Sequence, residues 1–196
     1  MLQFTQKKAH HHRTGKGNEA MDWYNEPPQW AASDNSVTMH SASQTDFWRL
    51  AGIARDNGHF YYQRQAGDFQ IGCKVSGSYN TQYDQAGLMV RVDEAHWIKC
   101  GIEFFNGAQQ ASAVVTREFS DWSIVPLPSN PESLWLRLKR QGAIIEIEYA
   151  LDGIHYQLLR QAYFSPAETM DVGLMCASPE GSGFSVTFED VAIRRI

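Results

Sequence analysis

The sequence predicts an all-β protein, a two-sheet antiparallel jelly-roll sandwich of the concanavalin A-like type. Three observations lead to this prediction. Short runs rich in Val, Ile, Phe, Tyr and Trp recur along the chain, apolar and polar residues alternate within them, and Gly, Asn, Asp or Pro separates them. Helical periodicity is hard to find. Two packed antiparallel sheets are the simplest way to bury one face of every strand.

The alternation can be followed residue by residue. Between Leu134 and Lys139 the leucines point to one side, while Trp135, Arg137 and Lys139 point to the other. Residues 97–103 repeat the pattern, with Trp97, Lys99 and Glu103 opposite Ile and Cys residues. A period of two with one apolar face is typical of antiparallel strands that turn one side to a core.

Turn signals separate the expected strands. Asn106-Gly107 and Asp152-Gly153 predict hairpins, because a type I′ turn needs positive φ at both central positions. Gln141-Gly142 is a weaker signal of the same kind. The expected strands cover residues 29–32, 36–40, 60–63, 68–76, 85–93, 97–105, 110–116, 134–141, 144–150, 157–162, 172–177 and 183–193.

Length favours one domain. A chain of 196 residues suits a single large β domain and can bury a core without disulfide or metal support. We expect this domain to span residues 21–196. Residues 1–20 show no sustained periodicity and are interpreted as a flexible leader or a tag.

Composition argues against several classes of protein. The net charge of −5 argues against a nucleic-acid binder, and no window reaches the ~18 apolar residues that a membrane helix needs. The odd set of Cys73, Cys100 and Cys176 lacks CxxC spacing, which argues against a disulfide framework and a zinc knuckle. Cys73 and Cys100 lie in apolar strand-like runs, which predicts buried free thiols and a cytoplasmic location. No P-loop, GxGxxG, EF-hand or zinc spacing occurs, so neither a metal nor a cofactor is expected.

Several segments resemble one family. They are Asp-Trp-Tyr-Asn-Glu-Pro-Pro at 22–28, Thr-Asp-Phe-Trp at 45–48, and residues 83–91, 97–103, 115–123 and 134–137. The resemblance is to the DUF1349 family, which is related to a yeast "regulation of enolase" protein within the concanavalin A-like lectin/glucanase superfamily. It runs from about Met21 to Ile196 and implies a sandwich with one convex and one concave sheet. The family implies no established activity, and residues 50–54 depart from an aromatic, His-containing stretch common in relatives.

One polar strand face suggests a binding site. Residues 85–93 and 97–103 are expected hairpin partners, so their cations, Trp97 and Glu103 approach one another. We expect a later strand to add Trp135 and Arg137, and a rim loop to add Trp122. Trp can stack on a sugar ring while charged groups bind its hydroxyls. The alternative is a solvent-facing sheet with cross-strand ion pairs. The candidate ligand-binding residues are Gln85, Arg91, Trp97, Lys99, Glu103, Trp122, Trp135 and Arg137.

No catalytic residue can be assigned. The E-x-D-x-x-E motif that retaining glucanases of this fold usually carry is missing, and Glu146 with Glu148 is its nearest imitation. The simpler interpretation of that pair is a solvated outer face. His59 has no local partner for catalysis and is interpreted as structural.

The leading hypothesis is therefore a lectin-like module that binds a carbohydrate or another small polar ligand on the concave sheet. A second hypothesis is a cryptic glycan hydrolase that uses, for instance, Glu103 with Glu146. A third is a protein-interaction or regulatory module affecting metabolism, suggested only by the name of the yeast relative.

Overall fold

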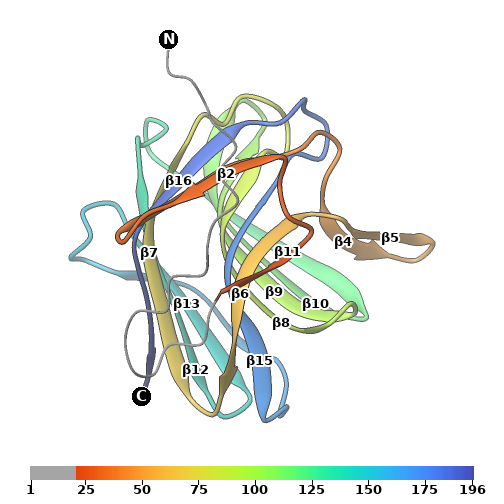
Figure 1. Cartoon of the computed structure of the whole chain (residues 1–196), viewed down its shortest axis with the longest axis vertical. Coiled ribbons are helices and arrows are strands. Elements are labelled where there is room, and N and C mark those ends of the chain that lie inside the picture. The colour runs from red at the N-terminus through yellow and green to blue at the C-terminus, as the bar shows by residue number, and fades with distance from the viewer. Residues whose placement is uncertain (1–20) are drawn as a thin grey trace.

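The computed structural model describes residues 21–196, which form two seven-stranded antiparallel sheets and one small hairpin (Figure 1). The first sheet contains, in spatial order, β1 (Asp22–Tyr24), β6 (His59–Ala66), β15 (Thr169–Ala177), β8 (Gln85–Asp93), β9 (His96–Phe105), β10 (Ala108–Arg117) and β11 (Phe119–Pro126). The second contains β14 (Gln157–Tyr163), β13 (Ile144–Ala150), β12 (Leu134–Gln141), β7 (Phe69–Gly77), β16 (Ser185–Arg195), β3 (Ser36–His40) and β2 (Gln29–Ala32). The hairpin contains β4 (Phe47–Leu50) and β5 (Ile53–Asp56).

The predicted all-β jelly-roll sandwich is confirmed. All twelve expected strands are present, and β2, β3, β8, β12 and β13 have the expected bounds. Four further strands, β1, β4, β5 and β11, were not predicted. Residues 117–123 were expected to be a rim loop; most of them instead form edge strand β11. No helix that could cross a membrane is found among residues 21–196.

The predicted turns have different outcomes. Asn106 and Gly107 both have positive φ, 52° and 79°, as a type I′ hairpin requires. The hairpin predicted at Asp152-Gly153 is present, since β13 and β14 pair antiparallel, but the dipeptide is not a type I′ turn, because only Gly153 of the two has positive φ, 74°. β13 ends at Ala150 and β14 begins only at Gln157, so the dipeptide lies within a longer connection.

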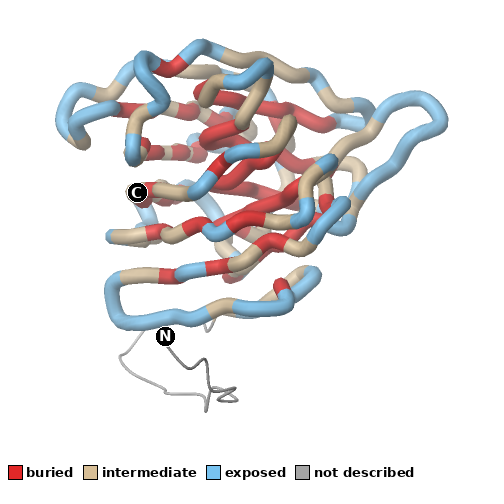
Figure 2. Tube along the Cα trace, turned by 90° about the horizontal axis from the view of Figure 1, so that it is seen from above, coloured by how far each residue is buried: buried red, intermediate tan, exposed pale blue. Residues whose placement is uncertain are grey.

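The main core lies between the two sheets (Figure 2). Leu134, Leu136 and Leu138 of β12 are fully buried, as the alternation predicts. The three cysteines are free and buried, as predicted for Cys73 and Cys100. Burial raises the pKa of both Cys100 and Cys176 to about 12, because a thiolate in an apolar core loses its hydration.

The first sheet is also covered on its outer face. The stretch from residue 42 to residue 58, here called the covering segment, links β3 to β6 and contains the β4–β5 hairpin. Its Phe47 is fully buried in a second apolar cluster with Phe60, Met89, Trp97 and Met175. A face that alternation alone would leave open to solvent is therefore largely closed by the chain itself.

His59 holds the start of the covering segment through a hydrogen bond. Its Nε2 accepts a hydrogen bond from the backbone N–H of Ala42 at 2.9 Å, so its Nδ1 donates to the carbonyl of Asn25 at 2.6 Å. The ring is 3% exposed, and burial lowers its pKa below the ordinary value of 6.5. The structural role predicted for this residue fits these contacts.

A pH dependence follows from this neutral ring. Since the folded pKa lies below the unfolded one, the contribution of His59 to stability is complete above pH 6.5 and is lost as the pH falls through the folded pKa. One extra proton on the unfolded chain costs up to about 1.4 kcal/mol per pH unit. Urea unfolding of wild type and His59→Gln at pH 7.5 and 5.0 measures this effect. We expect the variant to lose less stability on acidification, and an equal loss in both proteins would contradict the assignment.

Candidate functional site

Six of the eight predicted ligand-binding residues lie on the outer face of the first sheet. The register places Gln85 opposite Glu103 and Arg91 opposite Trp97. Lys99 lies between Trp97 and Glu103 on the same side of β9. Trp122 lies on this face, opposite Val114 of β10. The segment that contains Trp122 forms strand β11 and not the expected loop.

The other two do not join them. Trp135 and Arg137 lie on β12 of the second sheet and point away from its core. Arg137 donates to Glu148 Oε2 at 2.7 Å and covers the ring of Tyr156. The predicted grouping is wrong because alternation tells which residues share a strand face but not which sheet the strand enters.

The proposed hydrolase pair is separated for the same reason. Glu103 points outward from the first sheet, while Glu146 points outward from the second, near Gln161 of β14. The sandwich lies between these two carboxylates. They cannot act on one glycosidic bond, which requires a separation of roughly 5–9.5 Å.

Arg91 is occupied within the protein. Its guanidinium makes a bidentate ion pair with Asp56, with N–O distances of 2.8 and 3.0 Å. The Tyr24 hydroxyl donates to the same carboxylate at 2.6 Å, and its ring lies 4.4 Å from the guanidinium carbon. This arrangement joins β1, β5 and β8 and is best understood as a structural clamp.

Lys99 also holds the covering segment. Its ammonium donates to the carbonyl of Phe47 at 2.7 Å and to Asp46 Oδ1 at 3.3 Å. Gln85 Nε2 lies 3.4 Å from the same Asp46 oxygen. Asp46 and Asp56 could not be predicted as partners, because each is far along the chain from the cation it meets.

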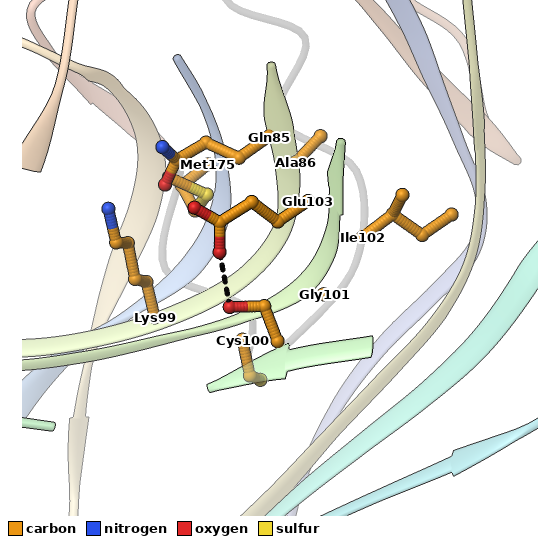
Figure 3. Close-up of a pocket in the computed structure, with 9 residues that line it drawn as sticks. Gln85, Ala86, Lys99, Cys100, Gly101, Ile102, Glu103 and Met175 are labelled. Atoms are coloured by element: carbon orange, nitrogen blue, oxygen red, sulfur yellow. Dashed lines mark hydrogen bonds between the residues drawn. The ribbon is translucent and has the colours of Figure 1, made fainter. Parts of the chain in front are cut away.

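A small recess lies on this face at Gly101 (Figure 3). Gly101 is one of its lining residues, and its cross-strand partner Gly87 allows β8 to approach β9 closely at this point. The volume available to the centre of a water molecule is about 10 Å³, which suits one water or one hydroxyl group. The lining residues are Gln85, Ala86, Lys99, Cys100, Gly101, Ile102, Glu103, Ser112 and Met175.

Glu103 supplies the acceptor of this recess. Its Oε2 accepts from Ser112 Oγ at 2.5 Å and from Trp122 Nε1 at 2.9 Å, and the residue is 6% exposed. Within the described part of the chain, no hydrogen bond to its Oε1 is found. On the adjacent strand, the buried Oε1 of Gln110 also has no partner. Gln110 does not line the recess, so the acceptor offered to a ligand there is Glu103 Oε1.

Three aromatic rings stand beside this carboxylate. The ring centroids of Phe105 and Trp122 are 5.0 Å apart and nearly perpendicular, and Tyr83 lies 5.7 Å from Phe105. All three side chains are half-buried. We call Tyr83, Phe105 and Trp122 the aromatic rim. Tyr83 and Phe105 were not among the predicted site residues, although Phe105 follows Glu103 by two positions and therefore lies on the same face of β9.

Comparison with known proteins gives two related chains from yeast. "Regulation of enolase protein 1" of Saccharomyces cerevisiae is 37% identical over 170 residues, which is 86% of each chain. A crystal structure of a functionally unknown protein from Saccharomyces cerevisiae has a TM-score of 0.86 and 35% identity, covering 90% of this chain and 96% of that one.

More distant structures share the fold alone. The carbohydrate-binding module CBM66 from Bacillus subtilis has a TM-score of 0.57 at 14% identity, covering 88% of this chain and 94% of that one. The GH43 BlXynB protein from Bacillus licheniformis has a TM-score of 0.69 at 14% identity, covering 87% of this chain but only 36% of that one.

A family model settles the membership of the chain. The model described as "Protein of unknown function (DUF1349)" matches residues 23–196, which include both sheets, the covering segment and the recess. The predicted resemblance is confirmed, and the chain belongs to the DUF1349 family.

Proposed function

We propose that this protein is a carbohydrate-binding module that holds a neutral sugar against the aromatic rim. One hydroxyl of the sugar enters the recess at Gly101, and an apolar face of the ring lies on Trp122. The observation that carries the proposal is the buried Glu103, whose carboxylate has an available oxygen directly beside three aromatic side chains.

The size of the recess supports a pose in which one hydroxyl lies inside it and the sugar ring lies outside it. A volume that takes a single hydroxyl cannot enclose a sugar ring, so the ring must remain at the surface. Aromatic side chains at the mouth offer it a flat apolar platform, and a carboxylate below fixes its orientation by accepting a hydroxyl proton.

Charge favours a neutral or amino sugar over an acidic one. Lys99 and Asp46 offset each other, and both are engaged with the covering segment. The charge that remains is the negative charge of Glu103. An acidic sugar would bring a second negative charge to a site with no uncommitted cation among its described lining residues.

The wider biological role is proposed on other grounds. The relation to a protein named for regulation of enolase supports a role that affects metabolism. Three buried free thiols support a reducing compartment, and we propose the cytoplasm. A carbohydrate-binding module among the proteins of similar fold is compatible with the proposed ligand.

A glycan array followed by calorimetry with the best sugar tests the proposal. We expect neutral sugars to bind and acidic ones to be rejected. Trp122→Ala should weaken binding by about tenfold or more, through loss of the stacking surface. Glu103→Gln should have a similar effect, because a charged acceptor is replaced by a neutral one that can still accept from Ser112 and Trp122.

Trp135→Ala is the matched control, since this indole lies on the other sheet and should leave affinity unchanged. Thermal unfolding of each variant separates lost binding from lost folding. If no sugar binds, or if Trp122→Ala binds as wild type does, the proposed site is wrong.

A further inference from the structure

The tip of the β4–β5 hairpin is an unusually apolar surface. Residues 50–54 read Leu-Ala-Gly-Ile-Ala, and all five are exposed, with Leu50 43% and Ile53 49% accessible. Figure 1 shows this hairpin projecting beyond the two sheets. Exposed runs of four or more apolar residues are costly to keep in water unless they bind something.

Next to the tip is a recess of about 300 Å³, bounded on its other side by the β10–β11 turn. Phe119 of that turn is 57% exposed and faces the hairpin residues across the recess. Two hydrogen bonds fix the arrangement: Arg49 Nε donates to the carbonyl of Glu118 at 3.2 Å, and Arg49 N donates to Ser120 Oγ at 3.0 Å. The apolar surface is thus part of a held structure.

The surface is flanked by arginines. Among residues 21–196, none of the ion pairs involves Arg49, Arg55 or Arg117, although Arg91, Arg137 and Arg160 each have a carboxylate partner. Glu118 is the one acidic residue that lines the recess. A chain with a net charge of −5 therefore carries a local basic, apolar patch.

β5 also offers a free strand edge. Among the strands of residues 21–196, it pairs only with β4. Because Arg49 N–H points away from β5 toward Ser120, the cross-strand pair of Arg49 and Ala54 exchanges no hydrogen bonds. The N–H and C=O of Ala54 therefore face outward, where an added strand could bond to them.

We propose that the hairpin tip, Phe119 and the three arginines form a docking surface for an extended segment of a partner protein that alternates acidic and apolar residues. The segment adds to the edge of β5, its apolar side chains cover Ile53 and Phe119, and its carboxylates pair with the arginines. Arginine and aromatic side chains beside apolar ones are the composition typical of binding hot spots. This surface is separate from the recess at Glu103.

A phage-displayed library of random dodecapeptides, selected on the full chain, tests this proposal. We expect enriched peptides to alternate Asp or Glu with apolar residues. Synthetic copies of these peptides should bind Ile53→Asp and the double variant Arg55→Glu/Arg117→Glu at least about tenfold more weakly than they bind the wild-type protein. Peptides in which basic residues replace the acidic ones should regain affinity for the double variant.

Ile154→Asp is the control, because Ile154 is 75% exposed on a different connection and its replacement should change nothing. Enriched peptides without an acidic bias, or equal binding to all variants, would overturn the proposal. So would phosphatidylserine vesicles that bind wild type but not Ile53→Asp, which would make the patch a membrane contact. A dimer in sedimentation that Ile53→Asp dissociates would make it a self-interface. Sugar binding should survive in Ile53→Asp and in the double variant Arg55→Glu/Arg117→Glu. This proposal and the proposed function can therefore fail separately.

Discussion

Replacing Gly87 by alanine is expected to destabilise the protein by about 3 kcal/mol or more, at the upper end of what overpacking costs. A Cβ at this position would lie 1.9 Å from the carbonyl oxygen of Cys100 and 2.6 Å from the Cα of Gly101. Both are backbone atoms of a central strand, so they cannot move aside as a flexible side chain would. The clash would separate β8 from β9 beneath the recess.

Urea unfolding measures this loss, with Gly72→Ala as the control. Gly72 also lies within a central strand, but the nearest atom to its added Cβ is the carbonyl oxygen of Leu136 at 3.3 Å. A shift of a few tenths of an ångström accommodates it, and we expect a cost below about 1 kcal/mol. If Gly87→Ala is no less stable than Gly72→Ala, the close approach of the two strands is not as described.

The second large effect is expected at the clamp. Asp56→Ala should cost about 3 kcal/mol, because it leaves the guanidinium of Arg91 unpaired with its side chain only 8% exposed. It also removes the acceptor of the Tyr24 hydroxyl. The exposed pair of Lys74 and Glu189 provides the comparison, and Glu189→Ala should cost less than about 1 kcal/mol.

A double-mutant cycle distinguishes the clamp from simple loss of packing. Asp56→Ala combined with Arg91→Met should be more stable than Asp56→Ala alone, since no buried charge is then left without a partner. Additive losses in guanidinium chloride unfolding would show that the two groups do not act as a pair.

The sequence predicted strands well wherever one face alone is apolar. Leu134, Leu136 and Leu138 reveal β12 directly, because each alternate position enters the core. β4 and β5 could not be found in this way, since their hairpin pairs with neither sheet and most of its residues are exposed. β11 was missed because it is an edge strand with polar residues on both faces.

The candidate site was predicted only in part. Alternation placed Lys99 and Glu103 on one face correctly, but it could not show what lies above that face. Phe47 covers this face, and the same covering segment supplies Asp56 and Asp46, the acidic partners of Arg91 and Lys99. Arg91 and Lys99, which look like ligand groups in the sequence, therefore hold the covering segment, and the proposed site keeps Glu103 and Trp122 of the predicted residues.

The reactivity of the three buried thiols can report when the folded protein opens. Cys73 lies on β7 in one layer of the sandwich, while Cys100 and Cys176 lie on β9 and β15 in the other, and their side chains share the core between the layers. A thiol-specific alkylating reagent can therefore reach them only when the layers come apart. The rate at which each cysteine is modified, read by mass spectrometry, reports whether the sandwich opens as a unit or one strand at a time, without any introduced label.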